Sequence, residues 1–181
     1  MPSHPHFLWT DIFKTRNAKS ATLIDALREN VLFKTLTTRE VRYLSRLVYE
    51  RVYLPEEPIF HQNDRGLGMY VIGKGRVAIK TLQPEGEFHV TTLHEKSFFG
   101  ELALVDGNNI RTASAVALER SVLIGFFKPD LMEILERKPA MGVKILYQLA
   151  TVLGERLLET TDRITLLSRA RQELHFNEEV I

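Results

Sequence analysis

The stretch FFGELALVDGNNIRTASAVA, residues 98–117, combines glycine, charge and apolar residues in an order that core packing alone does not require. Gly100 permits a tight backbone approach, and residues 101–104 are predicted to form about one helical turn. The N–H groups and the positive dipole end of such a turn favour an anion. The turn-forming residues 106–109 return Arg111 toward this helical turn, and its guanidinium can bind oxyanions in a fork. The stretch therefore predicts a phosphate site.

This stretch resembles the phosphate-binding cassette of the cyclic-nucleotide-binding domain family, in which F-G-E-L-A-L is followed, nine or ten residues after the Glu, by an Arg and small residues. Here Arg111 follows Glu101 by ten residues. The resemblance implies that Glu101 accepts the ribose 2′-hydroxyl of a cyclic nucleotide and that Arg111 neutralises the exocyclic phosphate oxygen. It also implies that the remaining phosphate contacts come from the backbone of Gly100, Glu101, Leu102 and Ala103.

The resemblance covers roughly residues 23–157 and implies four further site residues. In the family, a hydroxyl after the Arg touches the cyclic phosphate, and a Thr there also reaches the 2-amino group of a syn guanine; Thr112 stands at this position, followed by the small Ala113. Val90 is expected to pack against the base. The helix position that meets adenine in the activator relatives corresponds to Arg156, not to a hydroxyl residue. We predict cAMP or cGMP as the ligand, with cAMP slightly favoured.

Three alternatives share these residues. The spacing also suits a short buried helix with Glu101 and Arg111 as an ordinary surface ion pair. A domain that had kept the fold but lost the ligand would act as a scaffold or dimerisation module, although such a domain usually loses its Arg or Glu. An enzyme acting on a nucleotide would need a base, a nucleophile or a metal, and there is no cysteine, no G-x-S-x-G and no histidine pair at metal spacing. We predict neither catalysis nor a metal site.

The composition indicates a globular protein without a strong electrostatic field. The 181 residues are 44% hydrophobic, which suffices for one domain with an appendage. The 24 basic and 23 acidic side chains nearly balance, so no positive field draws the chain to nucleic acid or to an acidic membrane. The absence of cysteine suits a reducing compartment, and we expect a cytoplasmic protein with no signal peptide and no membrane span.

The hydrophobic periodicity predicts an α+β fold. Residues 1–18 are expected to form an arm, and residues 19–138 the binding domain. Thr37 and Glu40 have capping-box spacing before an amphipathic helix. From residue 51 to about residue 126 the period is two, with short runs broken by Pro, Gly and Asn/Asp clusters. We therefore predict a jelly-roll-like β-roll of about eight strands, flanked by N-terminal helices and a long C-terminal helix.

One segment, GMYVIGKG at residues 68–75, nearly matches a P-loop. The Ser or Thr that should follow Lys74 is replaced by Gly75, and residues 77–79 continue as a strand where the motif requires a helix. The segment is therefore predicted to be a hairpin turn.

A long helix is predicted over residues 139–174, followed by a tail at residues 175–181. Pro139 suits its first turn. A 4-3 spacing of mostly apolar residues indicates a seam for a partner helix, which predicts a homodimer. The positions are Leu146, Ala150, Leu153, Leu157, Thr160, Ile164, Leu167, Arg171 and Leu174.

This arrangement resembles the sensor half of the catabolite-activator family of bacterial regulators, with one departure. Only residues 175–181 follow the predicted long helix, whereas a helix-turn-helix reader needs three helices of its own. We therefore expect no direct DNA binding and a signal that passes to another, unidentified protein.

Overall fold

The computed structural model describes residues 21–84, 86–105 and 107–178, so the predicted arm at residues 1–18 lies outside it. Eight antiparallel strands form a roll of two four-stranded sheets, which confirms the predicted β-roll. In spatial order, the first sheet contains β1 (Tyr49–Tyr53), β8 (Ser121–Phe127), β3 (Gly68–Lys74) and β6 (Phe98–Phe99). The second contains β2 (Pro58–Phe60), β7 (Ser114–Ala117), β4 (Val77–Gln83) and β5 (Gly86–Leu93).

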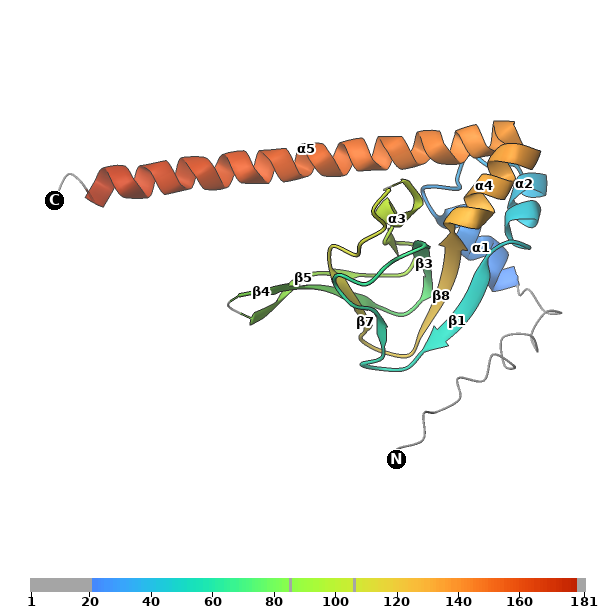
Figure 1. Cartoon of the computed structure of the whole chain (residues 1–181), viewed down its shortest axis with the longest axis horizontal. Coiled ribbons are helices and arrows are strands. Elements are labelled where there is room, and N and C mark those ends of the chain that lie inside the picture. Colours follow the sequence, from blue (N-terminus) through green and yellow to red (C-terminus); the bar gives the residue numbers. More distant parts are fainter. Residues whose placement is uncertain (1–20, 85, 106, 179–181) are drawn as a thin grey trace, which may run out of the picture.

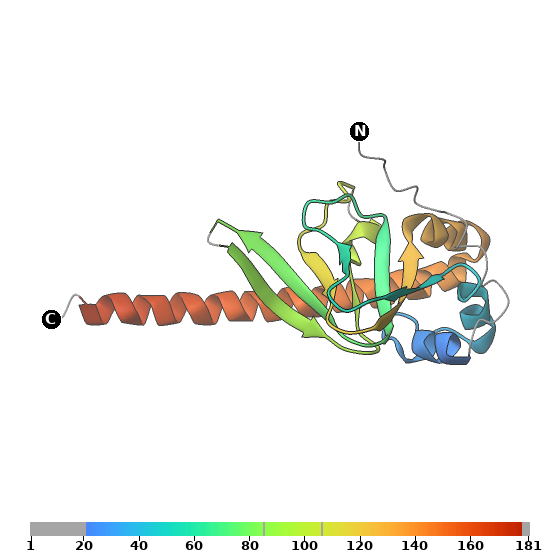
Figure 2. The same ribbon diagram turned by 90° about the horizontal axis from the view of Figure 1, so that it is seen from below.

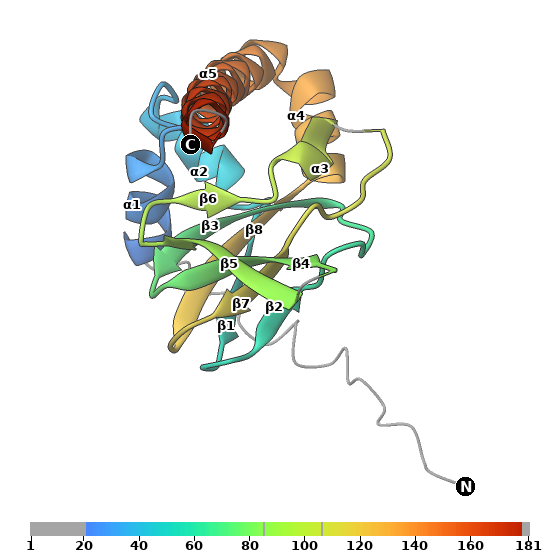
Figure 3. The same cartoon turned by 90° about the vertical axis from the view of Figure 1, so that its left-hand side faces the viewer.

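Helices gather at one end and on one side of this roll (Figures 1 and 3). They are α1 (Ala21–Glu29), α2 (Thr38–Leu44), α3 (Leu102–Val105), α4 (Lys128–Arg137) and α5 (Pro139–Glu178). With 40 residues, α5 is about 60 Å long, crosses over α3 and extends past the roll. The β4–β5 hairpin projects from the roll in the same direction (Figure 2).

Period-two alternation divides the buried side chains of the first sheet between two cores. On β3, Met69 and Val71 pack with the helices, whereas Ile72 faces the interior of the roll. On β6, Phe98 belongs to the helix-facing core and Phe99 to the inner one. The first sheet is thus a shared wall between a helical layer and the second sheet.

The predicted capping box is confirmed and also fastens α5. The Glu40 backbone N–H donates to the Thr37 hydroxyl at 3.3 Å, and the Thr37 N–H donates to Glu40 Oε2 at 2.6 Å. Lys144 on α5 donates to both Glu40 oxygens at 2.9 Å. Burial raises the pKa of Glu40, but the hydrogen bonds from Thr37 and Lys144 outweigh it and leave that pKa below its ordinary value.

The near-match to a P-loop is a strand and a hairpin turn, as predicted. β3 ends at Lys74 and β4 begins at Val77. Gly75 between them has φ +93°, in the left-handed region, and a Cβ there would collide with Ser121. Glycine is therefore required by the geometry of this turn, and the segment that follows it is a strand and not the helix of a P-loop.

Two features of α5 differ from the expectation. The helix continues to Glu178, so residues 175–178 of the predicted tail are helical. Leu146 and Leu153, which the 4-3 pattern assigned to a dimer seam, are partly buried against the domain's own core. The side chains of Arg171 and Leu174 lie outside the described residues.

Across the described residues, no helix is both long enough and apolar enough to cross a bilayer.

Candidate functional site

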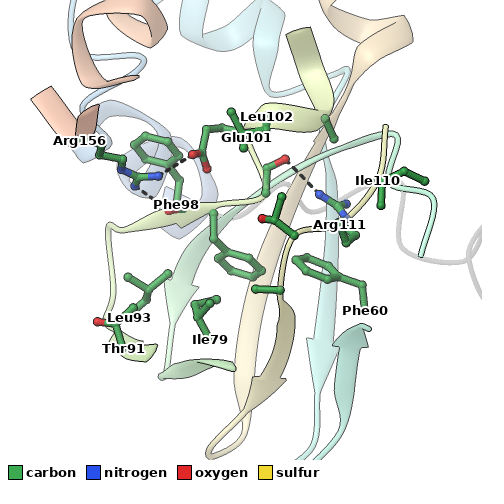
Figure 4. Close-up of a pocket in the computed structure, with 15 residues that line it drawn as sticks. Phe60, Ile79, Thr91, Leu93, Phe98, Glu101, Leu102, Ile110, Arg111 and Arg156 are labelled. Carbon is green, nitrogen blue, oxygen red and sulfur yellow. Dashed lines mark hydrogen bonds and ion pairs between the residues drawn. The ribbon is translucent and has the colours of Figure 1, made fainter. Parts of the chain in front are cut away.

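A cavity of about 330 Å³ opens between the cassette, residues 98–117, and the roll (Figure 4). This volume lies at the lower end of the range for small-ligand pockets. The predicted site residues that line it are Gly100, Glu101, Leu102, Ala103, Arg111, Thr112, Ala113 and Arg156. The fold therefore brings residues that are far apart in the sequence to the wall of one cavity.

Arg111 lies at one end of this cavity and is only 6% exposed. Its Nη1 donates to the Gly100 carbonyl at 3.0 Å, and its Nη2 donates to the Gly68 carbonyl at 2.7 Å. The guanidinium carbon stands 4.0 Å from the centroid of the Phe60 ring. The side chain is therefore held in place by backbone and by an aromatic face.

Two glycines make room for this guanidinium. A Cβ added at Gly66 or at Gly100 would collide with Arg111. Gly100 also has φ +74°, a conformation that L side chains rarely adopt. The glycine before α3 is thus needed both for the turn and for the placement of the cation.

The charge of Arg111 is incompletely compensated. Within the described ranges no carboxylate forms an ion pair with it, and its buried Nε–H has no hydrogen-bond partner. Burial lowers the pKa of Arg111, while Tyr70, Glu101 and Asp64 act in the opposite direction. Arginine nevertheless stays protonated in proteins. A desolvated cation with spare donors at a cavity wall is a good anion receptor.

Glu101 also lines the cavity, and its carboxylate pairs with α5. Arg156 Nη1 donates to Glu101 Oε1 at 2.6 Å, and the Glu101 side chain is only 9% exposed. The alternative in which Glu101 and Arg111 form a surface ion pair is therefore wrong, because both side chains are buried and Glu101 has a different partner.

Val90 does not line the cavity. Ile79 is paired with Thr91 and Lys80 with His89, so a register shift leaves Val90 as the extra residue of a bulge, 58% exposed. Thr91 and Leu93 line the cavity in its place.

Most of the apolar wall of the cavity was not predicted from the sequence. This wall consists of Phe60, Ile79, Leu93, Phe98 and Phe99. The available signal was the period-two alternation of the strands, which marks one face of each strand as internal. It does not say whether an internal side chain meets another side chain or a cavity.

The described residues contain no group of three or more His, Cys, Asp or Glu side chains placed to hold a metal ion. The cavity presents two cations, Arg111 and Arg156, one carboxylate, Glu101, the hydroxyls of Thr91 and Thr112, and an apolar wall, a lining that suits a small polar ligand.

Comparisons with known proteins agree with this geometry. Residues 50–138 match the family described as cyclic nucleotide-binding domain. The Cyclic AMP receptor protein of Thermus thermophilus is 32% identical over 143 residues, which are 78% of this chain and 64% of the relative. The cAMP-dependent protein kinase type II regulatory subunit of Drosophila melanogaster is 25% identical over 174 residues, or 95% of this chain and 45% of the relative.

A solved structure extends the similarity to three dimensions. The crystal structure of the N-terminal domain of a transcriptional regulator from Streptomyces coelicolor A3(2) has a TM-score of 0.67 at 29% sequence identity. The match covers 77% of this chain and 95% of that one. The fold of the sensor region is therefore shared beyond the matched sequence motif.

The chain spans less than two thirds of the length of each of these two curated relatives. The matched family is defined by nucleotide binding and not by a catalytic activity. The eight-stranded roll, the cassette with its glycine, glutamate and arginine, and the similarity in sequence and structure lead to one assignment. The chain contains a domain of the cyclic nucleotide-binding family, matched over residues 50–138.

Proposed function

We propose that the cavity binds a 3′,5′-cyclic mononucleotide, cAMP or cGMP, and that the protein is a non-catalytic sensor. The observation that carries this proposal is the environment of Arg111. It is a buried cation beside the cavity, with no carboxylate partner among the described residues and with an unused Nε–H. A cyclic phosphate brings one negative charge, which would compensate this cation.

The remaining walls suit the rest of such a ligand. Glu101 lines the cavity with its carboxylate turned toward Arg156 and away from Arg111 (Figure 4), and this carboxylate would accept a ribose hydroxyl. Ile79 and Leu93 form an apolar surface for a base. Two relatives are named for cAMP, a receptor protein and a protein kinase regulatory subunit, which supports the ligand class. Retention of Glu101 and Arg111 argues against the alternative of a ligand-free scaffold.

The choice between the two bases rests on Thr112 and Arg156, which both line the cavity. A threonine hydroxyl after the cassette arginine is compatible with either base, because it can serve the phosphate or a guanine amino group. We favour cAMP slightly.

The test is a calorimetric titration of the full chain with cAMP, cGMP and a cyclic dinucleotide. We expect one cyclic mononucleotide to bind per chain. Arg111→Ala should weaken it by about 2–4 kcal/mol, or about 30- to 1000-fold in Kd, because a desolvated phosphate loses its cation. The exposed Arg120 provides the matched control, Arg120→Ala. Parent-like binding by Arg111→Ala would reject the site, and no binding by the parent would favour the scaffold.

A second variant, Gly66→Ala, keeps the Arg111 guanidinium but displaces it, and so tests whether its position matters for binding. Gly66→Ala places a methyl group against Arg111, whereas Gly107→Ala meets open space and serves as the control. A thermal melt shows whether each variant is folded. Incubation of the parent with the ligand, followed by a search for a hydrolysis product, distinguishes binding from catalysis.

For the partners, we propose a homodimer through α5 and a further, unidentified protein that receives the signal. Support for the dimer comes from apolar side chains that α5 exposes beyond the domain, namely Leu157, Leu158, Ile164, Leu166 and Leu167. The cytoplasmic location and the absence of direct DNA contact stay predictions.

A further inference from the structure

Phe60, the last residue of β2, presents its ring face to the guanidinium of Arg111. The guanidinium carbon lies 4.0 Å from the ring centroid, within the distance at which an aromatic face attracts a cation. Figure 4 shows the two side chains together at one end of the cavity, and both of them line it. The site of the cation is therefore built by two segments, the cassette and β2.

We propose that Phe60 is the positioning residue of the phosphate site. Its ring face holds the Arg111 guanidinium in place in the ligand-free protein and leaves N–H donors of that group available to an anion. The inference rests on the proposed function, since the anion is the cyclic phosphate. Phe60 acts through Arg111 and not through a contact of its own with the phosphate.

The surroundings of the cation explain why a ring face suits this role. A buried cation without compensation is strongly destabilising. Two carboxylates act electrostatically on Arg111, Glu101 and Asp64, but both are engaged elsewhere. Glu101 accepts a hydrogen bond from α5 at 2.6 Å, and Asp64 Oδ2 accepts the His61 backbone N–H at 2.8 Å. The ring of Phe60 attracts the cation without using an N–H donor and without adding a negative charge that would compete with a phosphate.

The ring of Phe60 is itself held by two aromatic neighbours. Its centroid lies 5.8 Å from that of Phe99 and 6.2 Å from that of Tyr70. Those two rings stack on each other at 5.6 Å. Such ring pairs prefer defined geometries, so the cluster fixes the direction of the Phe60 face. Arg111 thus lies against a rigid surface that is in place before a ligand arrives.

The direct test is calorimetric titration of the full chain with cAMP and cGMP. Phe60→Leu keeps an apolar side chain but removes the ring face, so the guanidinium spends less time in the binding position and the apparent Kd rises. We expect a rise of about threefold to thirtyfold, which corresponds to the strength of a cation–ring contact. Phe60→Tyr keeps the ring face and should recover most of the affinity. Equal affinity of the parent and Phe60→Leu would overturn the inference.

A double variant separates positioning from direct contact, because Phe60 also lines the cavity. If Phe60 acts through Arg111, Phe60→Leu has no further effect on Kd once Arg111→Ala has removed the cation, as measured at millimolar ligand. Phe99→Leu is the matched control, since the same substitution is made in another ring of the cavity wall. Its effect on Kd should be the same with and without Arg111. The same persistence for Phe60→Leu would overturn the positioning role.

A second measurement requires no ligand. The Nε–H of Arg111 is buried, so its signal should be observable in ¹H–¹⁵N spectra, and its loss in Arg111→Lys assigns it. A proton above an aromatic face is shielded by the ring current. Phe60→Leu should therefore move this signal downfield, whereas Phe99→Leu should leave it near the parent position. A thermal melt shows that each variant is folded.

The two measurements distinguish failure of this inference from failure of the proposed function. An unchanged Arg111 signal in Phe60→Leu overturns the positioning role, even if the parent binds a cyclic nucleotide. A parent that binds no cyclic nucleotide rejects the proposed function, while a downfield shift in Phe60→Leu still establishes that the ring holds the cation.

Discussion

The two halves of α5 have similar apolar side chains in opposite environments. In the proximal segment, residues 139–152, the side chains of Met141, Ile145 and Leu149 are buried in the core. In the distal segment, residues 157–169, every side chain is exposed, including five large apolar ones. The difference lies in what runs alongside the helix: the proximal segment has the first sheet, α2 and α4 beneath it, and the distal segment has passed the roll (Figure 1).

This contrast indicates that the exposed apolar side chains of the distal segment belong to an interface. Single exposed apolar residues are normal on protein surfaces, but a long uncovered helix carrying five of them is typical of an interface. The exposed Val143 and Tyr147 extend the uncovered face back over the proximal segment. We therefore expect a helix that is held on one face by its own domain and on the other by a second copy.

The largest expected effect tests the proximal half. Leu149→Ala should lower the free energy of unfolding by about 2–5 kcal/mol, because a fully buried leucine leaves a cavity in the core. Leu158→Ala, the same substitution at a 68% exposed position, should change it by less than about 0.5 kcal/mol in dilute, monomeric protein. Chemical denaturation measures both. Equal losses of unfolding free energy in the two variants would contradict a buried proximal segment and an exposed distal one.

An intermediate effect tests the distal half. A stop codon after Leu157 removes almost all of the distal segment but keeps the Glu101–Arg156 ion pair and every residue that lines the cavity. We expect a monomer by light scattering that still binds cyclic nucleotide with a Kd within about threefold of the parent. Ile164→Asp in the full chain should also weaken the dimer, since a charge is unfavourable in an apolar seam. A dimeric truncated protein would place the interface elsewhere.

The smallest expected effect concerns the ion pair at the base of α5. Lys144→Gln should cost about 0.2–1 kcal/mol of stability, because its pair with Glu40 is partly exposed. The folded-state pKa of Glu40 is lowered, so its contribution is present above the unfolded value and is lost as the pH falls through the folded pKa. The difference between parent and variant should shrink below about pH 4.5, the ordinary glutamate value. Urea melts between pH 3 and pH 7 measure this; a constant difference would contradict the assigned pair.

Local patterns determined much of this protein. The Thr37–Glu40 capping box depends on residues three apart, and the strands depend on alternation of neighbours, so both could be predicted. The two-residue strand β6 could not, because Phe98 and Phe99 are too few to show a period. The cassette was recognisable because the turn, the glycine and the cation of a phosphate site lie within one short stretch.

Only the tertiary structure decided the contacts that depend on register and helix placement. Val90 leaves the cavity because a bulge in the β4–β5 pairing shifts it, and that pairing is a cross-strand property. Leu146 and Leu153 fit a dimer seam by spacing, yet the rotation of α5 on its own core partly buries them. Glu101 pairs with Arg156 across 55 residues of sequence because the packing of α5 brings its side of the helix to the cassette. The position of α5 depends on many contacts between residues that are far apart in the sequence, and a local sequence pattern does not contain that information.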